Sequence, residues 1–115
     1  MYGRPNPIIA RLHVILAEAD LTLPSIAAAA ELLNVSVSHL QHLLKEHEGC
    51  CYGDLARKER VRRALLILSR RPELSIELTA EALGCSAKTL YRDFKRECGV
   101  SPTEVRRGSE ITSSL

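Results

Sequence analysis

The sequence lacks any long apolar run, and none of its apolar segments approaches the roughly 18 residues that a membrane-spanning helix needs. The segment MYGRPNPIIARLHVI at the start has neither the apolar length nor the small-residue cleavage site of a secretory signal. At 115 residues the chain has room for one ordinary domain or two very small ones, and a large substrate-binding domain does not fit. We therefore expect a cytoplasmic protein with no membrane partner.

Cysteine is present but lacks the spacing of a metal site. The four cysteines are Cys50, Cys51, Cys85 and Cys98, and no two of them form a CxxC or another zinc-ligand pattern. A structural disulfide is not expected in a cytosolic chain. The adjacent pair Cys50 and Cys51 leaves a redox or metal sensor open, but ordinary thiols are the favoured interpretation. We predict no metal and no cofactor.

The sequence also has little excess of either charge. Its 16 Lys and Arg residues are nearly balanced by 14 Asp and Glu residues, and the net charge of +2 does not by itself indicate a nucleic-acid partner. The distribution is uneven, because residues 1–53 carry three basic and five acidic side chains whereas residues 54–107 carry 13 and 8. The second half therefore holds all of the positive excess.

Aromatic side chains make up only 3% of the chain, while the helix formers Ala, Leu, Glu and Arg dominate. Apolar residues recur every three or four positions rather than every two, which is the period of helices and not of strands. A first helix is expected after Pro7 and up to about Ala19. Its apolar stripe is formed by Ile8, Leu12, Ile15 and Leu16. We predict an all-α fold without strands.

The helical pattern repeats once. Sliding the sequence by fifty positions aligns residues 25–49 with residues 75–99 without a gap, and nine of the 25 aligned pairs are identical. Each copy has a capping serine, a tight turn (NVS or GCS) that ends on a second capping serine, and a final glycine. The inward residues are expected to be Ile26, Ala29, Ala30, Leu33, Val37, Leu40 and Leu44, and in the second copy Ile76, Thr79, Ala80, Leu83, Ala87, Leu90 and Phe94. Each copy is therefore predicted to be two helices joined by a tight turn.

Two further helices complete the expected fold of seven helices. Residues 54–70 lack Gly and Pro and carry an apolar stripe, which predicts one continuous linker helix that ends before Pro72. After the second copy, Ser101, Pro102 and Glu104 form a capping box, which predicts a short last helix to about Arg106. The expected parts are a first subdomain over residues 1–53, the linker helix over 54–71, a second subdomain over 72–107 and a flexible tail over 108–115.

Two helices joined by a tight turn, the second of them amphipathic, form the helix-turn-helix arrangement that places its second helix in the DNA major groove. The side chains expected to face away from the core are polar at matching positions. They are Ser38, Gln41, His42 and Lys45 in the first copy, and Lys88, Tyr91, Arg92 and Lys95 in the second. Arg and Lys can bond guanine, and Gln can bond adenine. We predict that these eight residues bind DNA, with an ordinary solvated helix face as the alternative.

The linker helix sets the expected scale of the DNA contact. At 1.5 Å per residue it would be about 25 Å long. With the packing at its ends, this is the scale needed to set two reading helices about 34 Å apart, one turn of DNA. A monomer could then read two successive major-groove segments. The basic residues of this helix could face solvent, anchor the subdomains or contact phosphate. They are Arg57, Lys58, Arg60, Arg62, Arg63, Arg70 and Arg71.

The histidines of the first copy are ambiguous. His42 lies on the expected reading face, where it could bond a base edge or a phosphate, whereas His39 lies nearer the edge of that face. Because imidazole changes charge near pH 6.5, a pH switch is open, but a histidine on a helix surface rarely acts as one.

These residues resemble the tandem helix-turn-helix DNA-binding domain of the AraC/XylS family of bacterial transcription regulators, over about residues 8–107. The resemblance is most specific at Arg60, Ala64 and Leu68 of the linker helix and along LGCSAKTLYRDFKRECGVSPTEVR, residues 83–106. The family landmarks in that segment fall at Gly84, Phe94, Lys95, Gly99, Pro102 and Arg106. The resemblance implies seven helices, base readers on the third and sixth, asymmetric promoter DNA as the ligand, and activation by contact with RNA polymerase, which would place the protein at the nucleoid.

The repeat and the resemblance together assign the cysteines. Cys50 and Cys85 align with valines of the other copy, and Cys98 falls where the resemblance implies an aromatic residue. These three are expected to behave as small buried hydrophobes. Cys51 aligns with the capping Ser101 and is the thiol expected to be exposed.

We predict a sequence-specific transcription regulator that acts as an activator and binds double-stranded promoter DNA as a monomer. A helical protein-interaction module or antagonist, which keeps the fold but binds a protein partner, is the alternative that the acidic first half suggests. An enzyme is disfavoured, and no catalytic residue is predicted, because the sequence shows no paired carboxylates or nucleophile-base arrangement.

Overall fold

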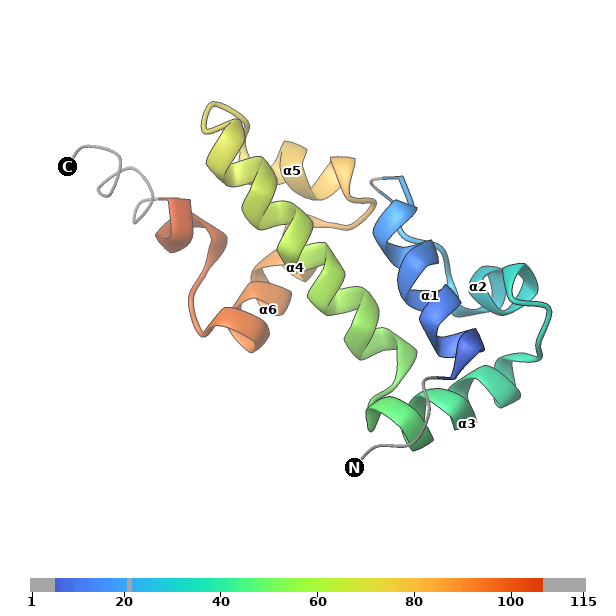
Figure 1. Cartoon of the computed structure of the whole chain (residues 1–115). Coiled ribbons are helices and arrows are strands. Elements are labelled where there is room, and N and C mark those ends of the chain that lie inside the picture. The colour runs from blue at the N-terminus through green and yellow to red at the C-terminus, as the bar shows by residue number, and fades with distance from the viewer. Residues whose placement is uncertain (1–5, 21, 107–115) are drawn as a thin grey trace. The chain divides into compact units, whose positions relative to one another are not determined.

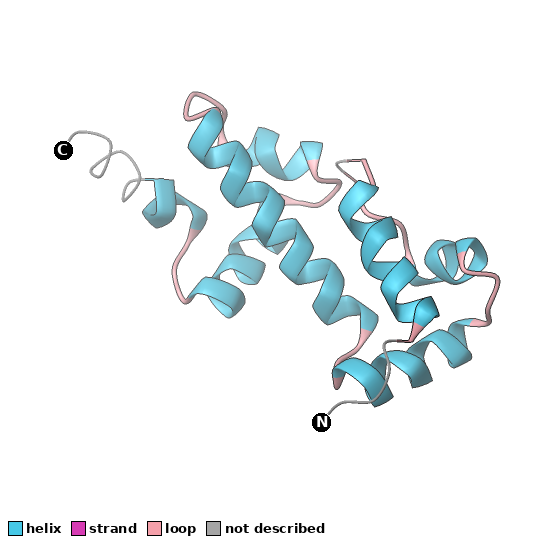
Figure 2. Cartoon of the chain, viewed as in Figure 1, coloured by secondary structure: helices cyan, strands magenta, loops and turns pink. Residues whose placement is uncertain are grey.

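The computed structural model describes residues 6–20 and 22–106. These residues form helices joined by short loops and include no strand (Figure 1, Figure 2). The helices are α1 (Pro7–Glu18), α2 (Ile26–Leu32), α3 (Val37–Glu48), α4 (Tyr52–Arg70), α5 (Ile76–Ala82) and α6 (Ala87–Cys98), and residues 102–106 form a seventh helical segment. The predicted all-α fold of seven helices is confirmed. No helix in this part of the chain is both long and apolar enough to cross a membrane.

The chain divides into two compact units, Met1–Ala56 and Arg57–Leu115, each with its own apolar core. The first unit contains α1, α2, α3 and the first residues of α4. The second unit contains the remainder of α4, then α5, α6 and residues 102–106. The tail expected over residues 108–115 lies outside the described residues.

The fifty-residue repeat is visible in the helix boundaries. Helices α2 and α5 have seven residues each and begin fifty positions apart, and α3 and α6 have twelve each with the same offset. Ser25, Ser36, Ser75 and Ser86 each precede one of these helices and accept a hydrogen bond from the backbone N–H three residues further on, at 3.0–3.1 Å. All four serines that the sequence identifies as caps are therefore caps in the structure.

The helix ends are equivalent as well. The tight turns place Asn34 and Gly84 in left-handed backbone, with φ of 59° and 78°. Gly49 and Gly99 end α3 and α6 at φ of 69° and 76°, and the N–H of each donates to the carbonyl oxygen four residues earlier. Left-handed backbone is the conformation that glycine adopts without steric cost and that asparagine tolerates better than most residues.

The repeat extends into the helix that follows each copy. The Cys51 N–H donates to Asp54 Oδ2 at 3.3 Å, as the Ser101 N–H donates to Glu104 Oε2 at 2.8 Å. Because this contact caps the first turn, α4 begins at Tyr52, two residues before the start that the apolar stripe predicts. The alignment of Cys51 with the capping Ser101 in the sequence thus corresponds to equivalent positions in the structure.

Both cores use the predicted inward residues. Leu40, Leu44, Leu90 and Phe94 have no exposed surface, and only Ile26, Val37 and Ala87 of the predicted set are half-buried rather than buried. In α1 the buried stripe is Ile9, Leu12 and Leu16, whereas Ile8 and Ile15 pack against its margin. Leu12 and Leu16 are thus buried as predicted, whereas Ile9 rather than Ile8 completes the buried stripe. Within α3 and α6, Leu43 and Asp93 are also buried without having been predicted, and they are fifty positions apart.

Candidate nucleic-acid interface

All eight predicted DNA-binding residues are exposed. Ser38, Gln41, His42 and Lys45 lie along α3, and Lys88, Tyr91, Arg92 and Lys95 lie along α6. Tyr91 is 38% exposed. The structure brings each set of four together on one helix, opposite side chains that are fully buried in the core of its unit. Contact of these residues with DNA stays a prediction.

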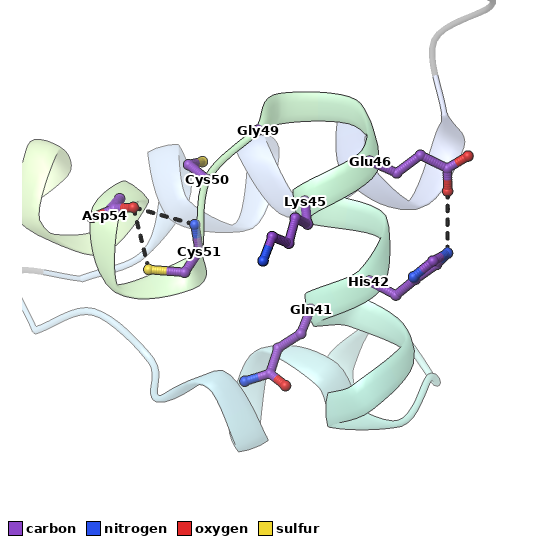
Figure 3. A pocket seen from close by; sticks show the side chains of 8 residues that line it. All are labelled: Gln41, His42, Lys45, Glu46, Gly49, Cys50, Cys51 and Asp54. Carbon is purple, nitrogen blue, oxygen red and sulfur yellow. Dashed lines mark hydrogen bonds and ion pairs between the residues drawn. The ribbon is translucent and has the colours of Figure 1, made fainter.

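The exposed face of α3 is polar but carries little positive charge. Lys45 is the one Lys or Arg in α3, and His42 Nε2 lies 3.4 Å from Glu46 Oε2. Beside this face the first unit has an open groove of about 670 Å³ (Figure 3). Its lining residues are Gln41, His42, Lys45, Glu46, Gly49, Cys50, Cys51 and Asp54. Three of the four residues of α3 that are predicted to bind DNA, Gln41, His42 and Lys45, thus line one groove together with the start of α4.

Histidines also connect α3 to α1 within the first unit. His13 makes a close contact from its Nε2 to Glu48 Oε1, and Asn6 Nδ2 lies 3.5 Å from His47 Nε2. Neither contact was predicted, since both join residues more than thirty positions apart. His39 is exposed, and its backbone N–H is bonded to the capping Ser36.

The exposed face of α6 is strongly basic. Lys88, Arg92, Lys95 and Arg96 are all exposed, and none of them forms an ion pair with a carboxylate in the described part of the chain. Arg96 was not among the predicted readers, although its place beside Lys95 could have indicated it. This face has the charge expected of a surface that approaches DNA phosphates.

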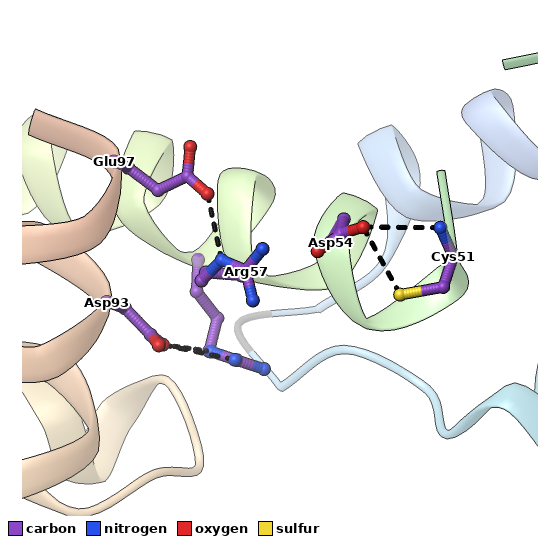
Figure 4. Close-up of polar contacts among 6 residues, drawn as sticks. Cys51, Asp54, Arg57, Asp93 and Glu97 are labelled. Atoms are coloured by element: carbon purple, nitrogen blue, oxygen red, sulfur yellow. Dashed lines mark hydrogen bonds and ion pairs between the residues drawn. The ribbon is translucent and has the colours of Figure 1, made fainter. Parts of the chain in front are cut away.

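Both acidic residues of α6 are instead bonded to arginines of α4. Arg57 Nε donates to Glu97 Oε1 at 2.8 Å, and Arg60 donates from Nε and Nη2 to Asp93 Oδ2 at 3.2 and 3.1 Å (Figure 4). The Asp93 side chain is only 4% exposed. The negative charges of α6 are therefore neutralised inside the second unit.

Tyr91, the aromatic residue of α6 that is predicted to bind DNA, has a partner within the second unit. The Tyr91 hydroxyl and Thr103 Oγ1 are 2.9 Å apart, so a hydrogen bond links the exposed face of α6 to residues 102–106. Arg106 Nη2 in turn donates to the carbonyl oxygen of Leu74, which precedes α5. Tyr91 thus has a structural contact in addition to its predicted contact with DNA.

Most of the basic residues on the linker helix are engaged in ion pairs. Besides Arg57 and Arg60, Arg62 and Arg63 both bond Glu59, and Arg71, just beyond α4, bonds Glu73. The hydrogen bond from Arg62, supported by that from Arg63, lowers the pKa of the Glu59 carboxyl. All of these pairs lie within the second unit. Lys58 and Arg70 are exposed and form no ion pair in the described part of the chain.

The prediction for Cys98 is wrong. Cys51 is exposed, as predicted, and Cys50 and Cys85 are half-buried rather than fully buried, but Cys98 is exposed. It is the last residue of α6 and occupies the position of Glu48 in the first copy, which is also exposed and could have indicated this. Burial raises the pKa of the Cys85 thiol. In the described residues no group of three or more His, Cys, Asp or Glu side chains could hold a metal ion.

Comparisons with known proteins agree on one kind of domain. Residues 29–108 match the profile of a family described as a helix-turn-helix domain. The chain is 39% identical over 83 residues to the HTH-type transcriptional regulator GlxA of Rhizobium meliloti (strain 1021). These aligned residues make up 71% of this chain and 25% of that protein. The chain therefore spans about a quarter of the length of this curated relative.

Solved structures of regulators share the fold. The C-terminal domain of AraT, a response regulator from Geobacillus stearothermophilus, superposes with a TM-score of 0.81 at 30% identity, over 92% of this chain and 88% of that one. A DNA-binding transcriptional dual regulator from Escherichia coli K-12 superposes with a TM-score of 0.79 at 27% identity, over 94% and 96%. Both similarities extend over nearly the whole of each chain.

Proposed function

The chain belongs to the AraC-type helix-turn-helix family of DNA-binding transcription regulators, and from this premise we propose that it reads two successive major-groove segments of promoter DNA with α3 and α6. The family predicted from the sequence is confirmed by these matches. The relatives are transcription regulators and not enzymes. The mode of DNA contact, through one helix of each unit, is the part that we propose.

The observation that carries the proposal is the matched pair of exposed faces. In both units the second helix of the repeat buries its apolar stripe and leaves four polar side chains at the same positions facing outward. On α6 these include Arg92 and Lys88, which can bond guanine, and on α3 they include Gln41, which can bond adenine. Major-groove readers need this combination of a rigid helix and outward hydrogen-bonding groups.

The two helices contribute unequally in this proposal. Helix α6 carries four exposed cations and α3 carries one. Phosphate contacts supply most of the salt-dependent affinity of a DNA-binding protein. We therefore assign the larger part of the affinity to α6, and to α3 a polar readout through Ser38, Gln41 and His42.

The internal repeat supports reading by a monomer. One chain carries two equivalent helices, α3 and α6, with the same length and the same pattern of exposed polar side chains. A single copy therefore offers one reading helix to each of two successive major-groove segments. The proposed parts are a first subdomain over residues 1–53, a linker over 54–71 and a second subdomain over 72–107.

The regulatory outcome is part of the same proposal. We assign an activator role, with RNA polymerase as the protein partner and the nucleoid as the location, on the resemblance to the AraC/XylS family. Binding through α3 and α6 would leave α2 and α5 available to a protein bound at the same promoter.

A salt titration tests the proposal. Binding to a duplex selected from random DNA should weaken steeply as salt rises, by about 0.9 in log K per unit of log salt concentration for each phosphate contact. A chain that makes about six such contacts would lose roughly a thousandfold in affinity between 50 and 200 mM salt. Weak binding that does not respond to salt would contradict the proposal and favour a module that binds a protein partner.

A further inference from the structure

Asp93 is a carboxylate buried on the inner side of the helix that is proposed to read DNA. We propose that Asp93 and Arg60 are positioning residues, and that their ion pair fixes the rotation of α6 about its own axis. Sequence specificity then depends on the pair, whereas affinity for DNA of any sequence does not. This inference rests on the proposed function of α6.

The geometry of the pair is directional. Arg60 donates two hydrogen bonds, from Nε at 3.2 Å and from Nη2 at 3.1 Å, to the same oxygen of Asp93. The side chains are 24% and 4% exposed, so little solvent competes for them. Charge-assisted hydrogen bonds from a planar guanidinium restrict the position and the direction of the carboxylate.

A fixed Asp93 also fixes its neighbours on the helix. Successive residues of an α-helix are about 100° apart around the axis. Because Asp93 follows Arg92 directly, any rotation of α6 that moves the carboxylate also changes the direction in which Arg92 leaves the helix. Lys88 and Tyr91 turn with it. The pair therefore sets the direction in which the predicted DNA-binding side chains of α6 leave the helix, although the pair itself does not contact DNA.

A second pair restrains the same helix one turn further on. Glu97 lies four residues after Asp93 and bonds Arg57, three residues before Arg60 on α4 (Figure 4). Both pairs are mostly buried, with Arg57 and Glu97 side chains 15% and 19% exposed. Two directional contacts on neighbouring turns oppose both rotation of α6 and sliding along α4.

The first copy shows that stability does not require a carboxylate at this position. Leu43 occupies the place of Asp93 in α3 and is 7% exposed, so an apolar side chain fills the equivalent position there. A buried ion pair is often no more stabilising than apolar residues of similar volume. Apolar packing has no preferred direction. The hydrogen bonds within the Arg60–Asp93 ion pair do have one. The exchange of Leu for Asp therefore adds orientation to α6 rather than stability.

The test compares two duplexes and four proteins. One duplex is selected from random DNA with the unmodified chain, and the other has the same length and composition with a scrambled sequence. The proteins are the unmodified chain, Asp93→Asn, Arg60→Lys and the control Glu81→Gln. Glu81 is exposed on α5 and, like Asp93→Asn, its substitution removes one negative charge from the second unit. Arg60→Lys keeps the charge of the pair but removes the planar fork.

The ratio of the two affinities is the readout. For Asp93→Asn and Arg60→Lys we expect this ratio to fall about tenfold, comparable to the loss of one base contact. Because the cations of α6 remain, affinity for the scrambled duplex should change by no more than about twofold. For Asp93→Asn the comparison is with Glu81→Gln, and for Arg60→Lys it is with the unmodified chain. A variant with only a structural defect would lose affinity equally on both duplexes. The comparison is made at a temperature where circular dichroism shows every variant folded.

An unchanged ratio in both variants would overturn the inference, whether the two affinities stay as they were or fall by the same factor. Should Asp93→Asn fail to fold, Arg60→Lys decides alone, because it leaves no buried charge without a partner. If the unmodified chain selects no sequence at all, the proposed function is wrong. If the unmodified chain selects a sequence and both variants have the same ratio of affinities as that chain, only this inference is wrong.

Discussion

Asn34 and Gly84 lie fifty positions apart and adopt the same left-handed backbone, with φ of 59° and 78°. In both turns the N–H of the next residue donates to the carbonyl oxygen of an alanine, Ala30 or Ala80, at 3.0 Å. The two turns are therefore the same structural device built from different residues, and each directs the next helix in the chain, α3 or α6.

This equivalence predicts the cost of a side chain at Gly84. Gly84→Ala should lower the free energy of unfolding by about 1–2 kcal/mol, since a Cβ is unfavourable in left-handed backbone. Gly53→Ala is the contrast, because Gly53 is the second residue of α4 and a Cβ there would meet only Cys51 Sγ at 3.7 Å. That variant should raise the free energy of unfolding by about 0.4–1 kcal/mol, since alanine leaves the unfolded chain fewer conformations than glycine does. Urea unfolding measures both, and a Gly84→Ala chain as stable as the unmodified one would refute the argument.

The bond between Tyr91 and Thr103 predicts a measurable coupling. Tyr91→Phe and Thr103→Val each remove one of the two hydroxyls and should each lower the free energy of unfolding by about 0.5–1.5 kcal/mol. The double variant should lose little more than either single variant, because both remove the same hydrogen bond. A double variant whose loss equals the total of the two single losses would show that the bond contributes nothing.

The bonds to Glu59 predict a dependence of stability on pH. Hydrogen bonds from Arg62 and Arg63 lower the pKa of Glu59 in the folded chain from its ordinary value of 4.5. A carboxyl with a lowered folded pKa stabilises the protein above its unfolded pKa, and this contribution is lost as the pH falls through the folded value. Glu59→Gln should therefore reduce stability at pH 7 and progressively less at lower pH. Urea unfolding of both chains from pH 7 to pH 3 measures the difference, and a difference that stays constant over this range would contradict the argument.

Alanine substitutions of Arg92 and Lys95 are predicted to change DNA binding in different ways. Arg92→Ala should cost about 1–3 kcal/mol on the selected site and relax specificity at one base pair. Lys95→Ala should weaken binding to all sequences alike and lower the salt slope by about one. Binding titrations on the selected duplex and on its single-base variants separate the two. A uniform loss across those duplexes for Arg92→Ala would identify it as a phosphate contact instead.

Much of the fold could be predicted because its determinants are local. The caps at Ser36 and Ser86 bond backbone three residues away, and the turn residues Asn34 and Gly84 act on their own backbone. Contacts of this kind are written within a few positions of sequence, and the repeat doubles the signal. The exposure of the eight predicted readers has the same local origin, because each set lies opposite an apolar stripe.

The contacts that could not be predicted join residues that are distant in the sequence. Asp93 was assigned no inward place, although Leu43 at the equivalent position is apolar, because its partner Arg60 is 33 residues away. The contact between His13 and Glu48 likewise joins α1 to the end of α3 across 35 positions. A buried carboxylate is stable only with such a partner, and composition and periodicity do not reveal the pairing. Alignment of the two copies is the signal that could have located Asp93.

The central claim is that α3 and α6 read two separate DNA segments, and mapping base preferences of single variants tests it most directly. Sites are selected from random DNA with the unmodified chain, with Gln41→Ala and with Arg92→Ala. We expect two blocks of preferred bases about ten base pairs apart, with Gln41→Ala relaxing only one block and Arg92→Ala only the other. A single block, or two variants that relax the same bases, would contradict the account.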